Sequence, residues 1–249
     1  MQYKKKSYFC IMITISNLKK QFGEKIAVDI EAFSVREGDM LGLVGNNGAG
    51  KTTLFRLVLD LLEADTGEVT LNNEGNAINP AKSEEWKLFT GAYIDEAFLI
   101  DFLTPEEFFQ FVGKANNMSQ EDIDARLADF TSLMQDEILG QKKLIRDLSA
   151  GNKQKVGIIA ALLAKPQLVI LDEPFNFLDP SSQIVLKRLL TDHHRNTHAT
   201  ILISSHNLQH TIDISTRIAL MENGHIVKDL PNTDGSAERE LEEYFSVES

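Results

Sequence analysis

The chain has 249 residues, of which 43% are hydrophobic, and 25 Lys and Arg oppose 37 Asp and Glu, for a net charge of −12. This composition excludes intrinsic disorder as the main state and supports a sizeable core. The acidic balance argues against a protein that spreads over nucleic-acid phosphates, which needs clustered Lys and Arg. One cysteine, Cys10, excludes an internal disulfide and favours a reducing cytoplasm.

The beginning of the chain has charged residues followed by apolar ones, in the order of a signal peptide, but no small-residue cleavage site follows. No apolar run approaches the roughly 20 residues that cross a bilayer. We therefore predict that residues 11–18 are the first strand, and that residues 1–11 are an extension if Met12 is the initiator.

The first half of the chain is predicted to be rich in strands. Alternating or continuous apolar residues bounded by turn residues predict strands at 11–18, 26–35, 40–44 and 68–71, with one helix at 51–62. From residue 104 to residue 149 the pattern becomes helical. Thr104, followed by Pro105 and two glutamates, is typical of a helix start, and Ser119 begins a second one.

The second half alternates strands and helices. We predict a strand at 168–171, a helix at 181–193, a strand at 200–204, and a hairpin closed by Asn223-Gly224 in a type I′ turn. A short surface helix at 237–245 ends the chain. Strands that alternate with helices indicate an α/β fold with a mainly parallel sheet.

A glycine-rich segment joins the predicted strand 40–44 to the predicted helix at 51. It fits the pattern G-x-x-x-x-G-K-[ST] in the strand-to-helix position that the pattern requires; an accidental glycine turn is the alternative. Glycines let the backbone wrap around phosphates, Lys51 adds a positive charge, and the Thr52 hydroxyl can bind Mg²⁺. The predicted phosphate-binding residues are Gly45, Asn46, Asn47, Gly48, Ala49, Gly50, Lys51 and Thr52.

Two carboxylates follow the predicted strand 168–171. Adjacent carboxylates alone indicate a solvated loop, but these follow four aliphatic residues in a chain that also has a phosphate loop. The end of a parallel strand would place Asp172 near the metal and Glu173 near the terminal phosphate.

These motifs, in this order, resemble the nucleotide-binding subunit of ATP-binding cassette (ABC) transporters from about residue 13 to residue 228. Residues 148–152, Leu-Ser-Ala-Gly-Asn, are similar to the family's signature loop, normally Leu-Ser-Gly-Gly-Gln. Residues 171–180 are similar to its joined phosphate-strand motif and D-loop, which contains Asp179. His206 matches the switch histidine, and Phe22 occupies the place of the aromatic residue that stacks on adenine.

The resemblance implies a P-loop NTPase core with a mainly parallel sheet, an antiparallel β-subdomain and a helical subdomain. It would make residues 1–249 one ABC ATPase domain, with its core at 12–94 and 165–230, helices at about 95–150 and a tail at 236–249. Phe22, the phosphate loop and Thr53 would bind ATP, with Mg²⁺ as cofactor. Lys51, Glu173 and His206 would be catalytic.

The resemblance also implies two partners. The signature residues Ser149, Ala150, Gly151 and Asn152 would act on ATP held by a second ATP-binding subunit, in a homodimer or a heterodimer. The second partner would be an integral membrane permease in a separate chain. The subunit would then be cytoplasmic, on the inner face of the cell membrane.

The sequence departs from the family at three positions. Asp95 occupies the place of the Q-loop glutamine; a carboxylate can also bind Mg²⁺, so we list Thr52, Asp172 and Asp95 as metal ligands. Ala150 replaces glycine, which would cost about 1 kcal/mol if that backbone needs a positive φ. Asn152 replaces glutamine.

Other candidates have structural explanations. His193, His194 and His198 lie in a polar segment that we interpret as a helix-to-strand connection rather than a metal site. The Phe-rich run at 108–111 is typical of a core, and part of it is a candidate for contact with the permease. Trp86 is interpreted as a packing residue.

Three functions follow as hypotheses. The first is the ATPase of a transporter with a separate permease, with export slightly favoured by the short C-terminus and the form of the Q-loop. The second is a cassette ATPase without a permease, acting on ribosomes or DNA. The third is a regulatory module with impaired hydrolysis, suggested by Asp95, Ala150 and Asn152.

Overall fold

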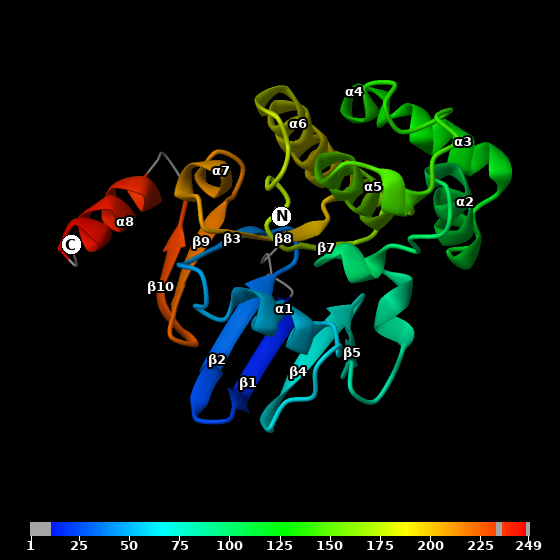
Figure 1. Ribbon diagram of the computed structural model, residues 1–249. Coiled ribbons are helices and arrows are strands. Elements are labelled where there is room, and N and C mark those ends of the chain that lie inside the picture. The colour runs from blue at the N-terminus through cyan, green and yellow to red at the C-terminus, as the bar shows by residue number, and fades with distance from the viewer. Residues whose placement is uncertain (1–10, 233–235, 248–249) are drawn as a thin grey trace, which may run out of the picture.

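The computed structural model describes residues 11–232 and 236–247. The expectations for Cys10 and for an N-terminal extension therefore concern residues outside the described part, apart from Ile11, which begins the first strand. Two sheets and a set of helices form the fold (Figure 1).

The first sheet is antiparallel and has four strands in the order β2-β1-β4-β5. These are β1(Ile11–Phe22), β2(Lys25–Arg36), β4(Thr66–Asn73) and β5(Asn76–Ile78). The predicted strands at 11–18, 26–35 and 68–71 are confirmed, and each extends further than its apolar alternation. The extensions of β1 and β2 pair as a hairpin, with Phe22 opposite Lys25 and a register shift between Lys20 and Gln21, so the pairing continues beyond the apolar residues.

The second sheet has six strands in the order β10-β9-β3-β8-β7-β6. These are β3(Met40–Val44), β6(Thr90–Tyr93), β7(Leu168–Leu171), β8(Thr200–Ser205), β9(Arg217–Glu222) and β10(His225–Pro231). All neighbours pair in parallel except β9 and β10, which form the predicted hairpin. Asn223 and Gly224 have φ angles of 46° and 86°, as a type I′ turn requires.

Both faces of the parallel sheet are covered. Helix α1(Lys51–Val58) lies between the sheets, where Leu54, Phe55 and Val58 share a core with β1 and β3. On the opposite face, α5(Ala150–Leu162) and α6(Pro180–Thr197) pack against β7 and β8 (Figure 1). Every residue of β3, β7 and β8 is buried, as expected for parallel strands covered on both faces.

The region between β6 and α5 is helical, as predicted. It contains η2(Glu96–Phe98), α2(Pro105–Ala115), α3(Gln120–Ala128), α4(Thr131–Met134) and η3(Ile145–Asp147). Thr104 and Ser119 cap α2 and α3 with reciprocal side-chain bonds to the third helical residue, which confirms both predicted starts. Phe108 and Phe109 are buried, whereas Phe111 is exposed, so the Phe-rich run is only partly core.

Some boundaries differ from the prediction. Helix α1 ends at Val58 rather than at residue 62, because Asp60 adopts a left-handed φ of 51° and the Leu61 N–H bonds back to Arg56. Helix α6 continues to Thr197, so the interpretation of His193 and His194 as part of a connection is wrong: both rings lie in the helix and bond backbone carbonyls.

The remaining elements are short. They are η1(Glu85–Leu88), which buries Trp86 as predicted, α7(Leu208–Ile212) and α8(Ser236–Val247). The predicted C-terminal helix is confirmed, and it is docked: Ala237 and Leu241 are buried with Ile218 and Leu220. Within residues 11–232 and 236–247, no helix is both long and apolar enough to cross a bilayer.

Candidate functional site

The phosphate loop, residues 45–52, connects the buried strand β3 to α1. Two of its positions accept only glycine. A Cβ atom on Gly45 would lie 2.2 Å from the Met221 carbonyl oxygen, and one on Gly50 would lie 2.2 Å from that of Ala27. Gly50 also has a φ of 114° and precedes the first residue of the helix. The loop is therefore pressed against β2 and β9.

Lys51 points back into the loop. Its side chain is buried, and its Nζ atom donates to the carbonyl oxygens of Gly45 at 2.6 Å and Asn46 at 3.4 Å. The same atom lies 3.5 Å from the Glu173 Oε1 atom. One ammonium group thus stands between the loop and a carboxylate that follows β7.

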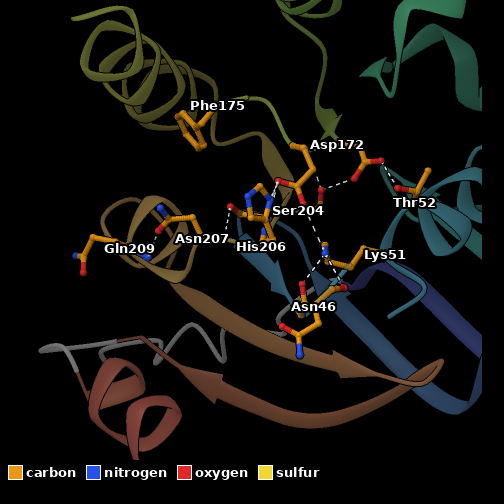
Figure 2. A network of polar contacts seen from close by, with 12 residues as sticks. Asn46, Lys51, Thr52, Asp172, Phe175, Ser204, His206, Asn207 and Gln209 are labelled. Carbon is orange, nitrogen blue, oxygen red and sulfur yellow. Dashed lines mark hydrogen bonds and ion pairs between the residues drawn. The ribbon is translucent and has the colours of Figure 1, made fainter. Parts of the chain in front are cut away.

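Both carboxylate oxygens of Asp172 accept hydrogen bonds from hydroxyl groups. Thr52 donates its hydroxyl to the Oδ2 atom at 2.5 Å, and Ser204 donates to Oδ1 (Figure 2). Burial raises the pKa of Asp172, and the hydrogen bonds from Ser204 and Thr52 act in the opposite direction. The structure therefore brings together two of the predicted metal ligands, Thr52 and Asp172. A hydroxyl and a carboxylate oxygen are a donor set that suits Mg²⁺.

Glu173 meets His206 in front of the phosphate loop. The His206 Nδ1 atom lies 2.8 Å from Glu173 Oε2, and the His206 backbone N–H donates to the same oxygen at 3.3 Å. All three predicted catalytic residues, Lys51, Glu173 and His206, are therefore adjacent. Glu173 and His206 follow the carboxyl ends of the parallel strands β7 and β8, and Lys51 begins α1 after the loop that leaves β3.

A cavity of about 280 Å³ opens over this site. It is lined by the loop from Asn47 to Thr53, by Glu173, and by Phe22, Lys25 and Ala27 from the β1–β2 hairpin. Phe22 is half exposed, as a ring that receives a planar ligand must be. Gly45 and Asn46, the first residues of the predicted set, are not among the lining residues; they instead accept hydrogen bonds from Lys51.

Sequence reasoning missed Lys25. Its Nζ atom would lie 3.5 Å from a Cβ atom built on Gly48, so the ammonium stands over the middle of the phosphate loop. Lys25 lies opposite Phe22 in the β1–β2 hairpin. Its position directly after the two-residue turn that follows Phe22 was the signal that could have indicated Lys25 in the sequence.

The signature segment, residues 149–152, lies elsewhere. Ser149 caps α5 through a 3.2 Å bond from the Asn152 N–H, and Ser149 and Ala150 are exposed. Ala150 has no positive φ, because it occupies the first helical position, so its methyl group adds no backbone strain. None of the four residues lines the cavity over the phosphate loop.

Gly151 ties the signature segment to the D-loop. A Cβ atom at Gly151 would lie 2.7 Å from the Phe177 carbonyl oxygen. Further along the D-loop, Asp179 caps α6 and accepts hydrogen bonds from the hydroxyls of Ser181 and Ser182. These bonds hold the pKa of Asp179 well below its usual range.

Asp95 is engaged by other groups. Its Oδ2 atom lies 2.7 Å from an Arg56 guanidinium nitrogen of α1, and its Oδ1 atom accepts from the Ala97 N–H. Its neighbour Glu96 pairs with Lys153 of α5 at 2.9 Å. The structure thus gives Asp95 different partners from Thr52 and Asp172, and its role as a metal ligand stays a prediction.

The comparisons with known proteins agree with this geometry. A sequence model of the ABC transporter family matches residues 29–176. The uncharacterized ABC transporter ATP-binding protein YhaQ of Bacillus subtilis is 32% identical over 213 residues, which cover 86% of this chain and 69% of the relative. The glycine betaine uptake system ATP-binding protein YehX of Escherichia coli is 29% identical over 217 residues, covering 87% and 70%.

A solved structure is also similar. It is described as the ATP binding subunit of an ABC transporter, is 26% identical in sequence, and covers 96% of this chain and 100% of its own, with a TM-score of 0.81. The family match, the relatives and the shared fold support the same conclusion. The chain belongs to the ABC transporter family, in which it is an ATP-binding subunit.

Proposed function

We propose that this subunit binds ATP with Mg²⁺ and hydrolyses it, in a dimer with a second ATP-binding subunit, to power a separate membrane permease. The observation that carries the proposal is the meeting of Lys51, Thr52, Asp172, Glu173 and His206 around one phosphate loop. Phosphoryl transfer depends mainly on such positioning and charge stabilisation.

The residues fit the nucleotide and its metal. The loop leaves no room for a side chain at Gly45 or Gly50, as expected of a cradle for phosphates. Thr52 and Asp172 would hold Mg²⁺, which when bound neutralises phosphate charge. Lys51 supplies a positive charge for the β- and γ-phosphates, and Phe22 supplies an exposed ring for the base.

The proton step belongs to Glu173. Its carboxylate would accept a proton from the attacking water, and its Oε2 atom is bonded to His206. The His206 imidazole orients that carboxylate from the end of β8. Carbonyl oxygens of the loop hold Lys51 beside Glu173.

The exposed signature segment supports a two-subunit site. Ser149 and Ala150 stand on the surface at the N-terminus of α5, a helix end that attracts anions. They lie outside the cavity of their own chain. In the dimer they would reach a phosphate chain held by the partner.

A second cavity supports the permease interface. It measures about 540 Å³, lies between β6, α2 and the end of α5, and borders the exposed side chains of Leu88 and Phe111. We propose that the permease docks there, which would place the subunit at the inner face of the membrane. The direction of transport stays a prediction: export was favoured from the sequence, whereas YehX is named for an uptake system.

The test is the Glu173→Gln variant. We expect ATP hydrolysis to fall by at least about 10²-fold, the scale of a positioned base, while ATP binding is retained and an ATP-bound dimer accumulates in gel filtration. Glu68→Gln, which changes a carboxylate on β4 that bonds Asn79, is the matched control. A Glu173→Gln monomer that still hydrolyses ATP would contradict both the base and the two-subunit site. A wild-type chain that binds ATP without hydrolysis would favour the regulatory module.

A further inference from the structure

The backbone of Glu173 is held in an uncommon conformation. Its φ angle is 46°, in the left-handed region, although it is not glycine. Such a conformation costs about 1 to 2 kcal/mol for a residue with a side chain, so it persists only where the surroundings determine it. Any group that holds this backbone also sets the direction of the Glu173 carboxylate.

The Ser204 side chain accepts a hydrogen bond from the backbone N–H of Glu173. The N–H donates to the Ser204 Oγ atom at 2.8 Å, and the same hydroxyl donates its hydrogen to Asp172. Ser204 lies near the end of β8 and has no exposed surface (Figure 2). A serine hydroxyl has one hydrogen and accepts through its lone pairs. Its single hydrogen is committed to Asp172, so the lone pairs face the Glu173 N–H.

The Gln154 side chain donates a hydrogen bond to the backbone carbonyl of Glu173. Its Nε2 atom donates to the Glu173 oxygen at 3.2 Å, and the side chain is buried, with 7% of its surface exposed. Gln154 lies on α5, two residues after the signature segment. The Glu173 carbonyl oxygen also accepts from the Asn176 N–H at 3.1 Å, within the turn that follows β7. Both backbone polar groups of Glu173 are thus bonded to a side chain from another element, one on β8 and one on α5.

We propose that Ser204 and Gln154 are positioning residues that set the carboxylate of Glu173 for the attack of water. The inference rests on the ATPase function proposed above. Ser204 bonds both the Glu173 backbone and the Asp172 side chain, and so fixes the position of one relative to the other. Gln154 fixes the position of the Glu173 backbone relative to α5, the helix that begins in the signature segment. Together they hold the carboxylate between Lys51 and His206. Its Oε1 atom lies 3.5 Å from the Lys51 Nζ atom, and its Oε2 atom lies 2.8 Å from the His206 Nδ1 atom.

The test uses Ser204→Ala and Gln154→Met, two substitutions on separate elements. Each is expected to lower kcat for ATP hydrolysis about tenfold while the Kd for ATP with Mg²⁺ stays within about twofold of the wild type. Ser204→Thr, which keeps the hydroxyl, should restore kcat. Ser205→Ala is the matched control, because it removes a buried hydroxyl one residue along β8 that bonds the Asn207 N–H instead.

A second measurement separates positioning from a general effect on folding. In a Glu173→Gln background, Gln154→Met should produce no further fall in the residual rate, because Gln154 acts through the carboxylate that is already removed. Ser204→Ala is left out of this background, because Ser204 also donates to Asp172. An equal further fall would overturn the inference, as would wild-type kcat in both single variants. If instead the wild-type chain does not hydrolyse ATP, the proposed function fails, and this outcome is distinct from failure of the inference.

Discussion

The phosphate loop and the signature segment are built in opposite ways. Around the loop, buried groups bind one another: Thr52 and Ser204 both donate to Asp172, and Lys51 is bonded to the loop carbonyls. In the signature segment, by contrast, Ser149 is exposed and bonds an N–H three residues further along. The first region is organised by three parallel strands, whereas the second is organised by one helix end.

This difference suggests how the two regions respond to change. Substitutions in the buried region remove a partner from several others, so their effects on ATP hydrolysis should be large. Substitutions in the exposed region should leave the binding of ATP to one chain intact and affect the step that requires the second subunit. The expected effects below run from the largest to the smallest.

Lys51→Ala removes the buried ammonium group that the loop carbonyl oxygens bind. We expect ATP hydrolysis to fall at least about 100-fold and ATP binding to become unmeasurable, because the phosphates lose a preorganised positive charge. Rates of phosphate release and a fluorescent-nucleotide titration measure the two effects. Lys187→Ala, which removes a lysine on α6 that pairs with Asp213, is the control. Wild-type turnover in Lys51→Ala would reject the phosphate-loop assignment.

Gly151→Ala tests the exposed region. The added methyl group would lie 2.7 Å from the Phe177 carbonyl oxygen, so the D-loop must shift. We expect hydrolysis to fall about tenfold while a single chain binds ATP normally. Ala150→Gly is the control, since Ala150 already has helical backbone and its rate should change by less than about twofold. Equal rates in Gly151→Ala and the wild type would show that the D-loop tolerates displacement.

Lys25→Gln sharpens the comparison at the edge of the buried region. We expect the Kd for ATP to rise about fivefold, because an ammonium over Gly48 is lost to the phosphates, while adenosine binding stays unchanged. Lys19→Gln removes the same charge from the same hairpin, where Lys19 pairs with Asp29 outside the cavity. If both variants weaken ATP binding equally, the effect is one of general charge.

Asp95→Gln tests whether the side chain at the Q-loop position binds the metal or only pairs with Arg56. The Arg56 ion pair predicts a loss of at most about 1 kcal/mol in the free energy of unfolding and an unchanged Mg²⁺ midpoint for hydrolysis, because exposed pairs contribute little. Arg56→Gln should then give the same loss. A shift of the Mg²⁺ midpoint in Asp95→Gln alone would instead place Asp95 among the metal ligands.

Asp179→Asn gives the smallest expected effect, and it depends on pH. The hydroxyls of Ser181 and Ser182 lower the pKa of Asp179, so its stabilising contribution is present above the unfolded pKa, near 4, and is lost as pH falls through the folded value. Asparagine still caps a helix but does not titrate. The wild type should melt higher than the variant at neutral pH, with a difference that shrinks progressively as pH falls below about 4 toward the folded pKa. A difference independent of pH would contradict this.

Several structural features were predictable from local sequence. The hairpin turn at Asn223-Gly224, the caps at Thr104 and Ser119, and the strand-to-helix position of the phosphate loop are all confirmed. Each depends on the conformation of a few adjacent residues. The end of α1 was not predicted, because apolar residues continue past the left-handed residue Asp60. The end of α6 was not predicted for the opposite reason: its last turn is polar, so the apolar pattern stops before the helix does.

The sequence by itself determined which groups are present at the candidate site: a lysine in a glycine-rich loop, a threonine hydroxyl, two carboxylates and a histidine, in the order of the ABC family. The tertiary structure alone decided which groups hold them in place. Ser204 and Gln154 reach Glu173 across 31 and 19 residues, and Lys25 reaches the phosphate loop from another sheet. Such contacts arise when parallel strands align their carboxyl ends and a helix packs across them, and no spacing in the chain encodes that alignment.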